Sequence, residues 1–201
     1  MILAFDTSTS ACTAALFHGG QCVGSSDEVI GRGHAERLAP MLADLLDGRS
    51  ADTILVGVGP GSFTGIRVAL AAASGLAIGW NADVRGFSSL ALLAASAEFD
   101  GEIAAAMAGG HGELFVQQFD GRLEAANDLA NLPPQAASEV IGAEIVVGSG
   151  AEALVDARGY GQAQDAWPSA RFVMRLPPAF RSLPAAPVYA RAPDAKARTA
   201  A

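Results

Sequence analysis

The feature that most constrains the fold of this sequence is a glycine-rich turn set between two apolar segments. Residues 53–59 read TILVGVG, and the turn GVGPGSFTGIR at 57–67 leads directly into VALAAASGLAIGW. A short apolar run, a cluster of Gly and Pro and a long apolar segment together predict a buried strand, a tight turn and a helix over 63–79.

The rest of the chain extends this unit into two unequal halves. Three strands are predicted at the start, over 2–6, 11–18 and 21–30. A helix over 34–46 carries a stripe of apolar residues in spite of Pro40, and a strand returns at 83–87. The second half repeats the pattern more weakly, with strands predicted at 102–107, 114–119 and 144–147 and a short helix after the last of them. The boundary is expected near residues 95–101, which gives halves at 1–97 and 98–190 and a flexible basic tail at 191–201.

Charge is distributed unevenly along the chain. Residues 1–180 carry nine Lys and Arg against 20 Asp and Glu, whereas residues 181–201 carry four basic residues and one acidic residue. Because residues 1–180 are strongly acidic, they repel the phosphate backbone of nucleic acids, so strong direct binding to RNA or DNA is not expected. The start of the chain has no signal-peptide pattern, and the longest apolar stretch, 68–80, is too short for a membrane span. We expect a soluble, cytoplasmic protein.

The two cysteines are predicted to be free thiols. They flank a hairpin turn at Gly19 and Gly20, which places Cys22 opposite Phe17 and Cys12 opposite Asp27, too far apart for a disulfide. With only three histidines and no close Cys/His pair, no metal site is expected.

The glycine turn fits none of the common catalytic or phosphate-binding motifs. A Walker loop needs a lysine, which the segment lacks. A dinucleotide-binding motif needs a third glycine, where this sequence has Ser62 or Thr64 depending on the register. A nucleophile elbow needs glycines two residues before and after its serine, where Ser62 has Pro60 and Thr64. Two interpretations stay open: an anion held at the helix N-terminus, or a turn whose glycines let backbones cross closely.

The helix after the turn has apolar positions on more than one face. The residues Phe63, Ile66, Leu70, Ala73, Ala77 and Trp80 form one seam, and the small residues Gly65, Ala69, Ala73 and Ala77 form a row beside it. Such a surface packs on its own sheet and the 34–46 helix, or also presents a face to another subunit; the sequence leaves both open.

Several segments resemble the TsaB (YeaZ) family: ILAFDTSTSACTAAL, HAERLAPML, GVGPGSFTGIRVALAAASGLA and GFSSLALLA, with a thinner match after residue 95. The resemblance implies an α/β, actin-like ATPase fold of the sugar-kinase and heat-shock type, with two related halves. It also implies a non-catalytic scaffold and activator for attaching threonylcarbamoyl to the adenosine after the anticodon in tRNAs that read codons beginning with A. The partners implied are a TsaD-type catalytic paralogue and a TsaE-type ATPase, with tRNA contacted only through the complex and with no cofactor; self-association of the free chain stays open.

The resemblance also assigns two sets of residues. The partner interface is expected to include His34, Leu38, Met41, Leu42, Leu45, Phe63, Ile66, Arg67, Ala69, Leu70 and Ala73. A vestigial nucleotide site is expected at Asp6, Thr7, Ser8, Gly59, Gly61 and Ser62.

Three features favour the non-catalytic interpretation. The turn Asp6-Thr7-Ser8-Thr9 lacks the glycine of phosphate-holding turns, Leu38 stands where the catalytic paralogue has its second metal-binding His after His34, and no basic groove is evident. Asp6 is interpreted as a turn residue that accepts nearby N–H groups, with a Mg²⁺-side carboxylate as the alternative.

One segment departs from the family. Residues 108–115, AGGHGELF, lack the charged pair usual there, which puts any role of that turn in doubt.

The alternative function is a small ATP-binding phosphotransferase or ATPase that uses Asp6, the glycine turn and Gly148-Ser149-Gly150. Peptidase activity finds little support, because no Ser or Cys stands in a nucleophile context.

Overall fold

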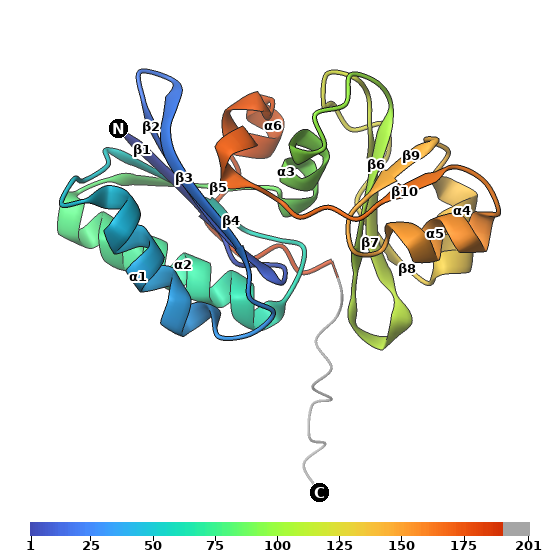
Figure 1. Cartoon of the computed structure of the whole chain (residues 1–201), viewed down its shortest axis with the longest axis horizontal. Coiled ribbons are helices and arrows are strands. Elements are labelled where there is room, and N and C mark those ends of the chain that lie inside the picture. Colours follow the sequence, from blue (N-terminus) through green and yellow to red (C-terminus); the bar gives the residue numbers. More distant parts are fainter. Residues whose placement is uncertain (191–201) are drawn as a thin grey trace, which may run out of the picture.

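The computed structural model describes residues 1–190 and contains two five-stranded mixed sheets that lie side by side (Figure 1). The expectation of a basic tail at 191–201 lies outside the described residues. Each sheet is covered on its outer face by two helices, while a third layer of helices lies between the two halves (Figure 1).

The first sheet has the strand order β3-β2-β1-β4-β5. Its strands are β1 (Ile2–Asp6), β2 (Ala11–His18), β3 (Gln21–Val29), β4 (Thr53–Gly57) and β5 (Asp83–Phe87). β2 is antiparallel to β1 and β3, and β4 is parallel to β1 and β5. These bounds agree with the predicted strands to within two residues.

Helices α1 (His34–Leu46) and α2 (Phe63–Trp80) pack on one face of this sheet. Because side chains alternate along a strand, Leu3 and Phe5 face these helices, while Ala4 faces the other half. α1 runs through Pro40. Of its predicted apolar stripe, Leu45 is half-buried and the other members are buried on the sheet: Leu38, Met41, Leu42 and Leu46. Burial of that stripe offsets the backbone hydrogen bond that the proline removes.

The second sheet repeats the first. Its strands are β6 (Ile103–Ala108), β7 (Leu114–Phe119), β8 (Ala130–Leu132), β9 (Ile145–Val147) and β10 (Gln162–Gln164), in the order β8-β7-β6-β9-β10. Helices α4 (Pro134–Val140) and α5 (Ala151–Arg158) cover its outer face, and a 3₁₀ turn, η1 (Gly110–Gly112), joins β6 to β7. Strand order, strand directions and helix insertions therefore match those of the first half, which confirms two related halves.

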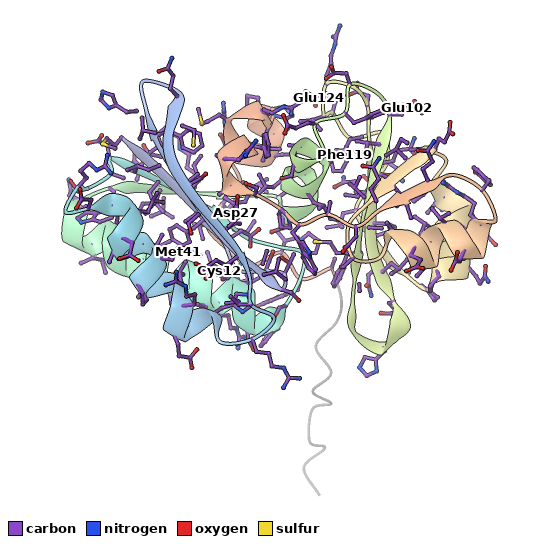
Figure 2. All side chains as sticks on the ribbon, viewed as in Figure 1. Cys12, Asp27, Met41, Glu102, Phe119 and Glu124 are labelled. Atoms are coloured by element: carbon purple, nitrogen blue, oxygen red, sulfur yellow. The ribbon has the colours of Figure 1, made fainter. Side chains whose placement is uncertain are left out.

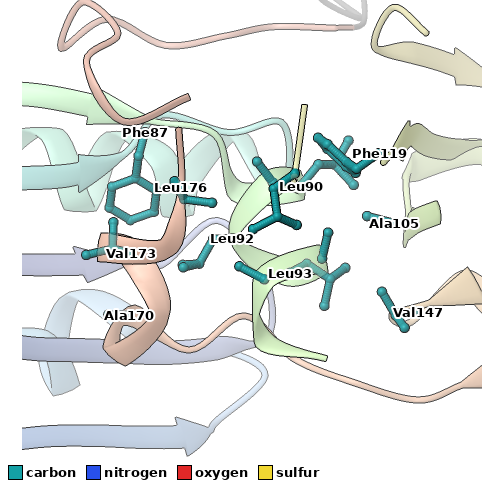
Figure 3. Packing of buried hydrophobic residues seen from close by; sticks show 14 of the residues in the cluster. Phe87, Leu90, Leu92, Leu93, Ala105, Phe119, Val147, Ala170, Val173 and Leu176 are labelled. Atoms are coloured by element: carbon teal, nitrogen blue, oxygen red, sulfur yellow. The ribbon is translucent and has the colours of Figure 1, made fainter. Parts of the chain in front are cut away.

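Helix α3 (Ser89–Ser96) joins the two cores, and its seven residues 89–95 are all buried. Figure 3 shows Leu90 and Leu93 between Phe87 on one side and Phe119 and Val147 on the other. The side chain of Ser88 caps the helix by accepting a hydrogen bond from the Ala91 amide. A helix that is apolar all round must be buried on all sides, which is the position that α3 occupies.

After the second sheet the chain returns to the first. The segment η2 (Ala170–Arg175) packs on β1, β2 and β3, and α6 (Pro178–Arg181) packs on β5. The Ala170 amide donates to the Thr13 hydroxyl at 2.7 Å, and the Thr13 and Ser169 hydroxyls both donate to the Asp27 carboxylate. The division at residue 97 stays a prediction, and residues 170–190 contact the strands of the first half.

The predicted register of the first hairpin is wrong by one residue at Cys12. Cys22 does lie opposite Phe17, but Cys12 lies opposite Glu28, because the register shifts at a bulge between Leu16 and Phe17. Both cysteines are free, as predicted. Cys12 is buried between the sheet and α1 beside Met41 (Figure 2), with its Sγ 3.8 Å from the Met41 Sδ, whereas Cys22 is exposed.

Candidate functional site: the glycine turn, the cleft and the helix face

The loop after β1 is a buried polar network inside the first half. The Asp6 carboxylate accepts hydrogen bonds from the Ser8 amide and from the Ser89 hydroxyl, both at 2.6 Å, and the Ser8 hydroxyl donates to that of Ser89 at 2.8 Å. The Thr7 hydroxyl donates to the Gly65 carbonyl at 2.7 Å. Asp6 therefore bonds a backbone N–H two residues ahead, as expected for a turn residue.

Burial sets the protonation behaviour of Asp6. Removal from water raises the pKa of its carboxyl above the ordinary value of 3.8, while the hydrogen bonds from Ser89 and Ser8 act in the opposite direction. The side chain is 1% exposed, and its two oxygens are occupied by protein donors. In this structure Asp6 joins the loop to α3.

The glycines of the turn lie against this loop. A Cβ atom on Gly57 would overlap the Asp6 carboxylate, and one on Gly61 would lie 2.2 Å from the Ser8 carbonyl oxygen. The Ser62 amide donates to that same oxygen at 2.6 Å. Gly61 also has a φ of 152°, which favours glycine. These close approaches account for the glycines through packing of one backbone on another.

The expected nucleotide-site residues only partly come together. Ser8, Gly61 and Ser62 line a cleft of about 1070 Å³ between the two halves, whereas Asp6 and Thr7 are buried behind it. Gly59 packs on Ile66 and on the Val188 carbonyl. From the second half, the cleft is lined by Met107–Gly110, Phe115 and Ser149.

The first turns of α1 and α2 also line this cleft. Residues Gly33–Glu36 and Ser62–Gly65 contribute to it, so backbone N–H groups of both helices lie at its wall. Arg32 and Glu36 are the ionised side chains in its lining within residues 1–190. The Nε2 atom of His34 is buried there with no hydrogen-bond partner. No group of three His, Cys, Asp or Glu side chains within residues 1–190 is placed to hold a metal ion.

Six of the eleven residues expected at a partner interface are buried in the chain's own core. These are Leu38, Met41, Leu42, Ile66, Ala69 and Ala73, each at most 5% exposed. Leu45 and Leu70 are half-buried against the same core, and His34 lines the cleft. Phe63 and Arg67 are exposed. The buried six hold α1 and α2 on the sheet, so a docking protein would meet other side chains of these helices.

The outer surface of α2 is unusually apolar for a surface helix. Only four of its 18 residues are fully buried, and its outward stripe reads Phe63, Arg67, Ala71, Ser74 and Ile78. Ile78 is 86% exposed. A groove of about 620 Å³ runs between this helix and α1, with Leu42, Leu76 and Trp80 among its lining residues. Length and composition would also allow α2 to cross a membrane, but it packs along the first sheet and α1.

Known proteins are similar to this chain in sequence and in architecture. The family model described as TsaD, tRNA N6-adenosine threonylcarbamoyltransferase, matches residues 22–148. The chain is 41% identical over 101 residues to TsaB of Escherichia coli K12, which spans 48% of this chain and 43% of that protein. The solved structure of YeaZ from Pseudomonas aeruginosa is 34% identical, with a TM-score of 0.77 over 94% of this chain and 98% of that chain. The chain belongs to the TsaB/YeaZ family.

Two further relatives agree with this placement. A solved structure described as an uncharacterized protein with similarity to peptidase YeaZ from Pseudomonas aeruginosa is 35% identical, with a TM-score of 0.80 over 94% of this chain and 99% of that chain. TsaB of Haemophilus influenzae is 39% identical over 101 residues, 48% of this chain and 42% of that protein. The sequence matches thus cover less than half of the length of either TsaB protein. The TsaB/YeaZ structures, together with the two mixed sheets, confirm the predicted actin-like ATPase fold class.

Proposed function

We propose that this chain takes part in the biosynthesis of threonylcarbamoyladenosine in tRNA as a non-catalytic, cytoplasmic subunit. In this proposal it binds and activates a TsaD-type paralogue through the outer surface of α1 and α2, together with a TsaE-type ATPase, and contacts tRNA only through the complex. Membership of the TsaB/YeaZ family supports the pathway.

The observation that carries the partner-binding role is the outer surface of α2. A helix rich in Ala, Leu and Ile that buries four of 18 residues leaves apolar area in water. Burial of such area against a second protein contributes roughly 25 cal/mol per Å². The groove beside Trp80 offers a concave surface into which a partner's side chains would fit.

Reconstitution tests the proposal. The chain is combined with tRNA, a threonylcarbamoyl-adenylate donor, a TsaD-type protein and a TsaE-type ATPase, and modified adenosine is measured with and without it. We expect product only when the chain is present, and we expect Asp6→Asn to support it as the parent does. Equal product without the chain would refute an activating role.

A matched pair of variants separates the α2 surface from general damage. Ile78→Glu places a charge on the proposed interface, and Val140→Glu places one on α4 in the second half, where Val140 is 51% exposed. We expect both variants to fold and only Ile78→Glu to weaken association with the TsaD-type protein, by about tenfold or more. If both variants bind as tightly as the parent, the interface lies elsewhere.

The alternative is an ATP-binding phosphotransferase that acts alone, and the cleft between the halves is the observation in its favour. Ser8 and the first turns of α1 and α2 line that cleft. Against it, the Asp6 carboxylate is buried behind the lining and its oxygens are occupied by Ser8 and Ser89. Calorimetry with the isolated chain and millimolar ATP and Mg²⁺ decides: binding that Asp6→Asn abolishes would support the alternative.

A further inference from the structure

Two exposed side chains of the first turns of α2 stack with a third from the distant segment before residue 190. The Cζ atom of Arg67 lies 3.6 Å from the centroid of the Phe63 ring, and the Phe63 and Tyr189 rings lie 5.0 Å apart, centroid to centroid. The Nε atom of Arg67 donates to the Tyr189 hydroxyl at 3.3 Å. Phe63 is 46% exposed and Tyr189 is 43% exposed. We call these three residues the Arg67 cluster.

Backbone contacts fix Tyr189 in the cluster. The preceding Val188 amide donates to the Val58 carbonyl at 2.8 Å, directly beside the glycine turn. Leu183 and Gly86 exchange two backbone hydrogen bonds, of 2.7 and 3.0 Å. The segment 183–189 thus lies over the turn, and Tyr189 is placed at α2 before any partner binds.

Arg67 carries a charge that the described part of the chain leaves unpaired. Within residues 1–190 it forms no ion pair, and its contacts are the Phe63 ring and the Tyr189 hydroxyl. Its two terminal guanidinium nitrogens have no acceptor among these residues. Stacking on Phe63 restricts the side chain, so less conformational entropy is lost when it binds.

Arg67 also belongs to the apolar outer stripe of α2, four residues before Ala71 and followed at helical spacing by Ser74 and Ile78. A partner that covers this stripe must cover Arg67 as well. Removing a guanidinium from water without a counter-charge costs free energy, whereas the planar guanidinium forms two parallel hydrogen bonds with a carboxylate.

We infer that the Arg67 cluster binds a carboxylate side chain, flanked by apolar groups, on the surface of the protein that packs on α2. Arg67 supplies two parallel N–H donors, and Phe63 and Tyr189 supply the apolar surround that excludes water from the pair. This inference rests on the proposed function and adds the residue chemistry of the contact, including Tyr189 from the C-terminal segment.

The test measures the dissociation constant of the full chain with a TsaD-type protein. Arg67→Ala is expected to raise it by about 10- to 100-fold, and Arg67→Lys, which keeps the charge and loses the fork, by at least about fivefold. Tyr189→Phe is expected to raise it by about two- to fivefold. Arg122→Ala, which removes an exposed charge from the second half, is the matched control and is expected to stay within about twofold.

Salt dependence identifies the ligand chemistry. The parent's dissociation constant should rise with ionic strength more steeply than that of Arg67→Ala. An equal slope would mean that no charge pair forms and would overturn the inference. Binding of inorganic phosphate by the isolated chain that Arg67→Ala abolishes would also overturn it, in favour of a small-anion site.

The outcomes separate this inference from the proposed function. If the parent binds and Arg67→Ala binds equally well, the Arg67 cluster is not an anchor and the proposed function stands. If the parent itself does not bind a TsaD-type protein, both proposals are refuted.

Discussion

Two glycines of α2 offer a sharp test of the packing argument, because they share a helix and differ in their surroundings. A Cβ atom on Gly65 would lie 1.8 Å from the Thr7 carbonyl oxygen, whereas a Cβ atom on Gly75 would meet nothing within 4 Å. Both residues have ordinary helical backbone angles, so alanine is compatible with the conformation at each position. The substitutions Gly65→Ala and Gly75→Ala therefore differ almost entirely in what the added methyl group touches.

The expected free energies follow from these surroundings. Alanine in place of an interior helical glycine contributes about 1 kcal/mol, and at Gly75 nothing opposes it. At Gly65 the methyl group must separate the helix from the Thr7 backbone by at least about 1.2 Å to reach the closest spacing that real side chains show, 3.0 Å. Overpacking of this kind costs about 1–3 kcal/mol.

The same separation disrupts two short hydrogen bonds, from the Thr7 hydroxyl to Gly65 and from the Ser62 amide to Ser8, at 2.7 and 2.6 Å. Each leaves a buried group unsatisfied, at about 1–3 kcal/mol. We expect Gly65→Ala to lower the free energy of unfolding by about 3 kcal/mol and Gly75→Ala to raise it by up to about 1 kcal/mol.

Equilibrium unfolding in urea, followed by circular dichroism, measures both variants against the parent. The difference between them is expected to be about 4 kcal/mol, a large part of the 5–15 kcal/mol typical of folded proteins. If Gly65→Ala is as stable as Gly75→Ala, the loop after β1 moves freely away from α2. The glycine turn would then need an explanation other than packing.

Three further predictions concern Asp6, the two cysteines and Asp27. Because burial raises the pKa of Asp6 above 3.8, the folded state keeps this proton to a higher pH than the unfolded state, and the group's contribution to stability is lost as the pH rises through the folded pKa. In urea unfolding, the stability of Asp6→Asn relative to the parent should therefore increase as the pH rises above 3.8. Burial raises the pKa of the Cys12 thiol to about 11, so in the native protein a thiol reagent should modify the exposed Cys22 quickly and Cys12 only on unfolding. Asp27→Ala should lower the free energy of unfolding by about 1–3 kcal/mol, because the Thr13 and Ser169 hydroxyls lose their acceptor. It should also speed hydrogen exchange of the Ala170 amide, which donates to the Thr13 hydroxyl. Unchanged exchange would contradict the role given to Asp27.

The first half was predictable because its elements carry strong local signals. The strands at 2–6, 11–18 and 83–87 and the helix at 34–46 have the predicted bounds. Helix α3 was missed, because SLALLAAS is apolar on every side and shows no helical periodicity. Strands β8 and β10, three residues each, are too short for a pattern to reveal them. The register error at Cys12 has a different origin: Gly24 is an isolated glycine inside a strand, which favours a bulge, and the prediction did not use it.

The sequence predicted which residues of the candidate site come together better than it predicted which of their side chains are exposed. The sequence placed the loop after β1 beside the glycine turn, and the structure brings Ser8 together with Gly61 and Ser62. Apolar residues of α1 and α2 serve the core and an interface equally well in a sequence pattern, so Leu42 and Ala69 could not be told apart from Ile78. Tyr189 could not be found at all, because its contact with Arg67 joins residues 122 positions apart.

The repeat of the fold explains why glycines occur where a phosphate loop would also need them. In each half, the end of the fourth strand and the turn after it cross the end of the first strand. Gly57 approaches Asp6 at the end of β1, Gly61 approaches Ser8 just after it, and Gly148 lies against the Ala106 carbonyl near the end of β6. A Cβ atom at Gly148 would lie 2.5 Å from that oxygen and 2.5 Å from the Leu93 side chain. A related substitution test extends to the second half, where the φ of 111° at Gly148 adds backbone strain to these contacts. If Gly148→Ala is as destabilising as Gly65→Ala, both turns are required by the strand order itself, and only their outer surfaces, such as the Arg67 cluster, are left to distinguish one function from another.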